Sequence, residues 1–271
     1  MPLTAIRHVR KMRGGAQAHL LEADDGHWYV VKFRNNPQHR RILVNELAAS
    51  ALLGYLKIAI PETALIHVGP AFLDANPEVH LTLGTRHIAV EPGWHFGSRY
   101  PGDPARTAVY DFLPDALLPK VANLDDFLAI LVFDKWVANA DGRQCVFYRA
   151  MVQQGAGAHA GFVARMIDHG FAFNGPNWDF PDSPLQGLYA RRTVYEGVQS
   201  LDNFQPWLDQ VCHFPEEVMD LAWKSIPADW IAGEENELEQ LLERLFERRK
   251  RVPELIAACR ELRTNPFPNW K

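Results

Sequence analysis

Apolar and polar residues alternate along much of the first third of the chain, which is the pattern of half-buried β-strands. The alternation predicts strands at residues 6–9, 18–22, 28–33, 64–68 and 87–91. Asp24-Asp25-Gly26 separates the second of these strands from the third and is typical of a hairpin turn. Between about residues 38 and 53 the apolar positions recur near every 3.6 residues, which predicts one helix that ends before Gly54.

The remainder of the chain is mainly helical in pattern and contains one pair of strands. Pro92–Pro104 is rich in proline and glycine, and we expect it to connect two lobes. The elements expected after it are a helix at 124–138, strands at 144–149 and 162–167 joined by a Gln/Gly/Ala loop, a helix with an apolar stripe from Leu238 to Phe246, and a helix from Pro253. This order predicts an α+β protein of two lobes, a β-rich one over residues 1–92 and a mainly helical one over residues 93–271.

The composition narrows the class of protein without naming a function. A formal charge of −5 and an isoelectric point near 6.1 argue against binding to nucleic acid or to an anionic membrane surface. No apolar run approaches the roughly eighteen residues that span a bilayer, and no apolar stretch follows the basic N-terminus as in a secretory signal. The three cysteines lie far apart, and the sequence holds neither CxxC nor HExxH. We therefore expect a cytoplasmic protein without a zinc site.

A turn with two glycines, Gly14-Gly15-Ala16-Gln17, lies between the first two predicted strands. Because glycine has no side chain, backbone N–H groups in such a turn can approach the oxygens of a phosphate. Two glycines in a hairpin are also what an ordinary turn contains, so this signal is weak alone.

A lysine and a glutamate come next in the order that phosphoryl transfer requires. Lys32 ends the strand Tyr29-Val30-Val31-Lys32, where a kinase carries the lysine that contacts nucleotide phosphates. A lysine on an edge strand more often faces water. Glu46 lies beside the apolar stripe of the following helix, where an unpaired carboxylate would be costly, and this favours a pair with Lys32.

Two acidic residues flank the predicted hairpin of the second lobe. Asp141 lies in the polar turn Asn139–Gln144, where it could orient or deprotonate a hydroxyl group, and Arg143 could position phosphate or hold a loop. Asp168 follows an apolar strand and precedes Gly170, a place suited to a metal ligand. Each turn also has an ordinary structural explanation, but two acids beside one hairpin, with a lysine in the other lobe, form a specific constellation.

At this point the sequence resembles the HipA-like kinase family, within the wider protein-kinase-like and phosphoinositide-kinase-like fold. The resemblance covers about residues 14–173 and is carried by Gly14-Gly15-Ala16-Gln17, Val31-Lys32-Phe33, Asn45-Glu46-Leu47-Ala48, Leu53-Gly54, Ile60-Pro61, Ile88-Ala89-Val90-Glu91, Asn139-Ala140-Asp141-Gly142 and Ile167-Asp168-His169-Gly170.

The resemblance implies roles for several of these positions. Lys32 would contact the α- and β-phosphates of ATP and pair with Glu46, and Ala89-Val90-Glu91 would be the hinge that meets adenine. Asp141 would be the catalytic acid or base, and Asp168 would ligate Mg²⁺. The resemblance also implies transfer to serine or threonine of a protein, in some members by the toxin of a toxin–antitoxin pair.

Three departures from the family pattern bear on this expectation. The family's metal-binding asparagine, five residues after the catalytic aspartate, is replaced by Val146, so Gln144 is the candidate substitute and one or two metals remain open. Residues 13–19 contain no serine, so autophosphorylation cannot occur there. The chain has no room for the extra N-terminal subdomain of longer HipA toxins, and an antitoxin-like partner is not assumed.

The sequence therefore predicts an ATP- and Mg-dependent kinase that acts on a hydroxyl group of a protein or small molecule. Two alternatives stay open, which are an ATP-binding module without kinase activity and a transferase that attaches AMP. A third interpretation, a protein whose C-terminal helices bind a partner, is less favoured because the Leu238–Phe246 stripe is more typical of a core.

Overall fold

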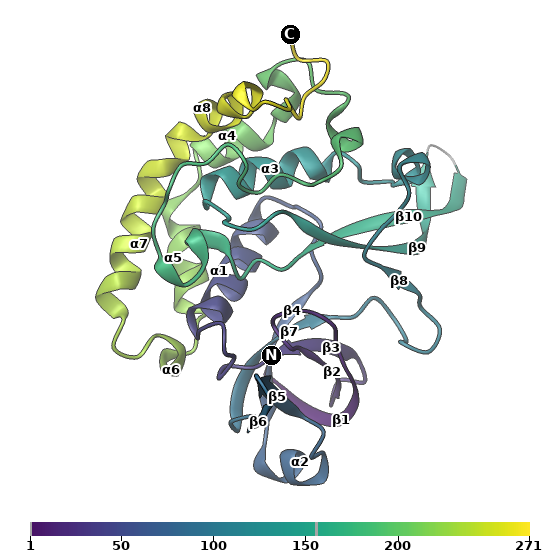
Figure 1. Ribbon diagram of the computed structural model, residues 1–271, viewed down its shortest axis with the longest axis vertical. Coiled ribbons are helices and arrows are strands. Elements are labelled where there is room, and N and C mark those ends of the chain that lie inside the picture. The colour runs from purple at the N-terminus through teal and green to yellow at the C-terminus, as the bar shows by residue number, and fades with distance from the viewer. Residues whose placement is uncertain (1, 155–156) are drawn as a thin grey trace.

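Five strands near the N-terminus close into a small barrel, visible at the lower end of the molecule in the computed structural model (Figure 1). The structure describes residues 2–154 and 157–271. The barrel strands, in their order around the sheet, are β1 (Leu3–Lys11), β2 (His19–Ala23), β3 (Trp28–Lys32), β7 (Gly93–Arg99) and β4 (Thr63–Val68). The pair β1–β4 is parallel and the other pairs are antiparallel. Apolar side chains that alternate along these strands fill the barrel.

Helix α1 (Arg41–Tyr55) follows β3 and packs into the helical part of the molecule (Figure 1). Its Leu43, Leu52 and Leu53 are buried in one large core together with the C-terminal helices. Because α1 is buried on most sides, polar groups on its inner surface need partners inside the protein.

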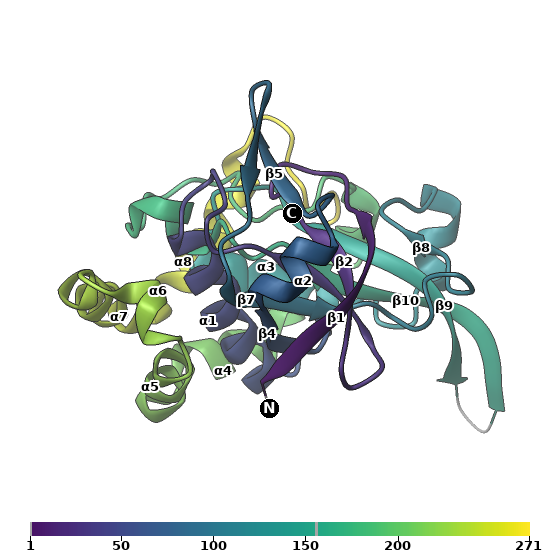
Figure 2. The same ribbon diagram turned by 90° about the horizontal axis from the view of Figure 1, so that it is seen from below.

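Residues 69–92 form an excursion between β4 and β7. They contain α2 (Pro70–Ala75) and the hairpin of β5 (His80–Leu83) and β6 (Arg86–Ala89), which stand at the end of the barrel (Figures 1 and 2). The expected connector at Pro92–Pro104 is therefore partly wrong, because Gly93–Arg99 is the barrel strand β7. A division of the lobes at residue 92 would remove that strand from its barrel.

The second half of the chain consists of a three-stranded sheet and a group of helices. The sheet has the order β10-β9-β8, with β8 (Val109–Tyr110), β9 (Gln144–Gln154) and β10 (Gly157–Ile167). The β9–β10 hairpin projects from the body of the molecule (Figures 1 and 2). The helices are α3 (Asp126–Trp136), α4 (Trp207–Cys212), α5 (Glu216–Lys224), α6 (Ala228–Ile231), α7 (Glu235–Arg248) and α8 (Val252–Ala257).

The predicted α+β arrangement is confirmed, with a β-rich first part and a mainly helical second part. Both strands of the predicted hairpin exist and run longer than expected, and residues 155–156 of its expected loop lie outside the described residues. The apolar stripe of α7 is part of the core, with Leu238, Leu241 and Leu245 buried. Within residues 2–154 and 157–271, none of the helices combines the length and apolar character needed to cross a bilayer.

Candidate functional site

A cleft of about 760 Å³ lies between the barrel and the β9–β10 hairpin. Its volume is within the range of small-molecule sites. The barrel contributes the turn between β1 and β2, the end of β3 and the end of β7, and the second half of the chain contributes the first residues of β9 and the last residues of β10. Both parts of the chain therefore contribute side chains to this cleft, and one ligand can contact them together.

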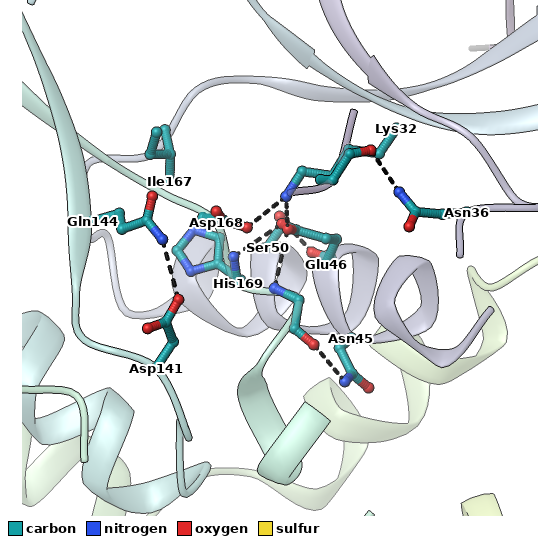
Figure 3. Close-up of polar contacts among 12 residues, drawn as sticks. Lys32, Asn36, Asn45, Glu46, Ser50, Asp141, Gln144, Ile167, Asp168 and His169 are labelled. Carbon is teal, nitrogen blue, oxygen red and sulfur yellow. Dashed lines mark hydrogen bonds and ion pairs between the residues drawn. The ribbon is translucent and has the colours of Figure 1, made fainter. Parts of the chain in front are cut away.

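Lys32 lies at the inner end of this cleft and is bonded to two carboxylates (Figure 3). Its Nζ donates to Asp168 Oδ1 at 2.7 Å and also to Glu46 Oε1. Burial alone would lower the pKa of Lys32, but the two carboxylates raise it above its ordinary value. Burial likewise opposes ionisation of Asp168, but Lys32 and Arg143 lower its pKa below the usual range. Both groups are charged at neutral pH.

Glu46 also holds the backbone that follows Asp168. Its Oε2 accepts from His169 N at 3.1 Å and its Oε1 accepts from Gly170 N at 3.0 Å (Figure 3). A Cβ at Gly170 would come within 2.5 Å of Ile42 Cγ2, so only glycine fits against α1 here. One buried carboxylate thus fixes both the lysine and the segment that carries Asp168.

Asn45, the neighbour of Glu46 on α1, makes a second clamp on the same segment. Its Nδ2 lies 2.8 Å from Gly170 O and 2.9 Å from the carbonyl oxygens of Ala172 and Gly175, and its Oδ1 accepts from Trp178 Nε1 at 2.9 Å. Sequence reasoning gave Asn45 no role. An amide flanked by the apolar Val44 and by Glu46 in a buried helix is the signal that could have found it, because buried amides need several partners.

Asp141 lies in the turn after α3 and is exposed. Its Oδ1 accepts from Gly142 N at 2.8 Å, and its Oδ2 accepts from Gln144 Nε2 at 3.1 Å. Gln144 begins β9 opposite Ile167, the residue before Asp168, and its amide oxygen points away from Asp141 (Figure 3). Gln144 thus bonds to Asp141 and is paired with the residue that precedes Asp168.

The family model for HipA-like kinases matches residues 5–253. The chain belongs to the HipA-like kinase family. It is therefore an atypical kinase, a phosphotransferase, as the sequence predicted. A search of curated proteins finds no match.

Solved structures of kinases resemble this HipA-like kinase in fold. CtkA, a proinflammatory kinase of Helicobacter pylori, is 15% identical with a TM-score of 0.57, and the match covers 97% of this chain and 99% of that one. The Golgi casein kinase with Mn and ADP bound is 14% identical with a TM-score of 0.55, over 96% of this chain and 74% of that one. These likenesses confirm the predicted protein-kinase-like fold.

Arg143 is buried in the HipA-like kinase and cannot reach a phosphate. Its Nη2 and Nε donate to Asp134 Oδ1 and Oδ2 at 2.6 and 2.9 Å, and its Nη1 donates to Ile167 O at 2.7 Å. Nη1 also lies 3.2 Å from His169 Nδ1. Of the two roles that the sequence suggested, the structure contradicts phosphate positioning and supports the holding of a loop, because every guanidinium nitrogen already has a protein partner.

The glycine turn of the kinase divides into two parts. Gly14, Gly15 and Ala16 line the cleft, as a phosphate-binding turn requires. Gln17 does not line it, because its side-chain amide bonds instead to the backbone of Thr82 in β5. The expectation that Gln17 contacts the nucleotide is therefore corrected.

The predicted hinge at Ala89-Val90-Glu91 lies outside the cleft. Ala89 ends β6 and its carbonyl accepts from Asn35 Nδ2 at 2.9 Å, while Glu91 pairs with Arg34 at 3.2 Å. Ser98, Arg99 and Tyr100, at the end of β7, line the cleft in their place. The error follows from the excursion, since the strand that leads into the second lobe is β7 and not the strand before Pro92.

Proposed function

We propose that this HipA-like kinase binds ATP and a divalent cation in the cleft and transfers the γ-phosphate to a hydroxyl group, with serine or threonine of a protein as the expected acceptor. The observation that carries the proposal is the bonding of Lys32 to both Glu46 and Asp168 at the inner end of the cleft. A buried lysine between two acids is the arrangement that kinases use to hold the phosphates of ATP next to a metal ligand.

The phosphates would lie between the glycine turn and Lys32. Among the described residues, the N–H groups of Gly15 and Ala16 donate to no protein acceptor, so they are available to phosphate oxygens. The base would lie along the barrel wall of the cleft, where Val30, Phe96 and Tyr100 supply apolar and aromatic surface. We accordingly place the division between the lobes after Tyr100.

The cation would be held by Asp168, with Gln144 as a second protein ligand. The donor set suits Mg²⁺ or Mn²⁺, because an ionised carboxylate and an amide oxygen are hard oxygen ligands and nucleotide phosphates supply further ones. Val146 lines the cleft at the position where the family resemblance implies an asparagine, and its apolar side chain cannot ligate a metal. The Mn and ADP in the Golgi casein kinase, whose fold is similar, support a nucleotide with a divalent cation.

Asp141 would act on the acceptor. It is exposed at the turn before β9, so an acceptor hydroxyl can approach it from solvent, and the Gln144 amide restrains one of its oxygens. Its role would be to orient the hydroxyl and take its proton as the phosphoryl group is transferred.

Nucleotide binding and group transfer can be tested in one experiment. The melting temperature is measured with ATP alone, with Mg-ATP and with Mn-ATP. We expect ATP to raise the melting temperature, and Mg-ATP and Mn-ATP to raise it more than ATP alone. Intact-mass spectrometry of the protein and of added acceptor proteins then identifies the attached group. Attached AMP would favour adenylyl transfer, and binding without any transfer, which Val146 makes a specific alternative, would favour a nucleotide-binding module.

A further inference from the structure

Residues 69–92 leave and rejoin the barrel at one place. Val68 ends β4 and Gly93 begins β7, and these two residues are paired in the barrel sheet. A short turn would therefore have been enough to join the two strands. The excursion instead builds α2 and the β5–β6 hairpin, and its Leu81 and Val90 are buried with the barrel core. This packing fixes the hairpin against the end of the barrel.

The outer edge of β5 receives the side chain of Gln17. Its Nε2 donates to Thr82 O at 2.7 Å, and its Oε1 accepts from Thr82 N at 2.7 Å. The amide thus makes the two bonds that a residue of a neighbouring strand would make. Lys11 Nζ adds longer bonds of 3.3 Å to Gln17 Oε1 and Thr82 Oγ1. Because two bonds reach the backbone of one residue, both the position and the plane of the amide are fixed.

These bonds act on a turn whose backbone conformation is unfavourable. Gln17 has a φ of 49°, in the left-handed region that residues with a Cβ seldom adopt, and its N–H closes the turn on Gly14 O at 3.2 Å. A second amide, Asn36 Nδ2, donates to Ala16 O at 2.5 Å. Gly15 lies between these restraints and the cleft. Because glycine has no side chain, its position depends on the bonds that its neighbours make.

We infer that the β5–β6 hairpin positions the turn that binds the nucleotide phosphates, and that Gln17 is the positioning residue that couples the two. The inference rests on the proposed function. Gln17 itself touches no nucleotide, and its effect is to hold the N–H groups of Gly15 and Ala16 towards the cleft before a ligand arrives.

The test compares Gln17→Asn and Gln17→Ala with wild type in the full chain. Asparagine keeps the amide and tolerates the left-handed region, but it is one methylene too short to reach Thr82. Both variants are expected to raise the Kd for Mg-ATP and the KM for ATP about tenfold, while kcat changes by less than about threefold. Thr82→Pro removes the N–H that donates to Gln17 Oε1, and it should also raise the Kd for Mg-ATP and the KM for ATP. Gln240→Ala on the exposed face of α7 is the matched control.

The outcomes separate the inference from the proposed function. If wild type binds no nucleotide, the proposed function fails and the inference fails with it. If wild type binds Mg-ATP and Gln17→Asn binds it within about twofold, the inference alone is overturned. A lower melting temperature with unchanged Kd and KM would also overturn it, because the contact would then only stabilise the fold.

Discussion

Gln144 donates through Nε2 to Asp141 Oδ2 at 3.1 Å, and this bond turns its amide oxygen away from Asp141 (Figure 3). An amide has one donor end and one acceptor end, so a single side chain can restrain a carboxylate on one side and face a cation on the other. In the proposed reaction, Gln144 therefore links the residue that acts on the acceptor with the cation beside Asp168.

Asp141→Asn is expected to lower kcat by about 10²- to 10⁴-fold, the usual effect of removing a general base. Asp141 does not line the cleft, so the Kd for Mg-ATP should change less than about twofold. Steady-state phosphorylation and isothermal titration measure the two quantities. Turnover by Asp141→Asn close to the wild-type rate would remove Asp141 from the reaction.

Gln144→Ala is expected to raise the Mg²⁺ concentration needed for half-maximal activity about tenfold, because one oxygen ligand is lost. Gln144 is exposed, so the free energy of unfolding without ligands should stay within about 0.5 kcal/mol of wild type. A titration of activity with Mg²⁺ at fixed ATP provides the measurement. An unchanged midpoint would mean that the amide only restrains Asp141.

Glu46→Ala is expected to destabilise the protein by about 3–5 kcal/mol, because it removes the acceptor of three bonds and leaves Lys32 with only the half-buried Asp168 as counter-charge. Glu46→Gln keeps the volume of the side chain and should destabilise the protein less than Glu46→Ala. It should also lower kcat, because a neutral amide does not balance the positive charge of Lys32. Urea unfolding and kinetics separate these effects. Glu237→Ala, on the exposed face of α7, is the control.

Arg143→Ala is expected to lower the free energy of unfolding by about 3–5 kcal/mol, because Asp134 would remain buried without its partner. Asp134→Ala should cost a similar amount, and the double variant less than the sum of the two. A double-mutant cycle by urea unfolding gives the coupling between them. Additive losses would show that the pair contributes little beyond its separate contacts.

The burial of His95 is expected to lower the free energy of unfolding in mild acid. Burial, helped by Arg34, lowers the pKa of His95 to about 3 from 6.5. Below about pH 6.5 the unfolded chain binds a proton that the folded protein excludes, so the free energy of unfolding falls by about 1.4 kcal/mol per pH unit. His95→Asn can keep an acceptor for Arg34 N, whose bond to Nδ1 is 3.0 Å, and should flatten this dependence. Melting curves between about pH 7 and 5 test it. Equal slopes in both proteins would contradict it.

Local sequence patterns were sufficient for the parts of the site that lie at the ends of single elements. Lys32 at a strand end, Glu46 beside an apolar stripe and Asp168 before a glycine each carry their signal within a few neighbouring residues. These three are the residues that the structure brings into contact. The family model also confirms the kinase class that their order predicted.

The position of the hinge and the contacts of the Gln17 side chain depend on residues that are distant in the sequence. Short sequence patterns do not contain such contacts. β7 was missed because its sequence, Gly93–Arg99, begins with glycine and contains Gly97, where a Cβ would come within 2.5 Å of Ile66 Cγ1. A strand that needs glycine for packing loses the alternation that identifies strands. Gln17 and Thr82 are joined across 65 residues, and only the placement of the excursion makes them neighbours.

The clamp made by Asn45 has a consequence for the energetics of catalysis. Its bonds to the carbonyl groups of Gly170, Ala172 and Gly175 order the segment after Asp168 as part of folding. The conformational entropy of that segment is lost when the chain folds and not when substrate arrives. Binding energy is therefore not diverted into ordering this part of the site.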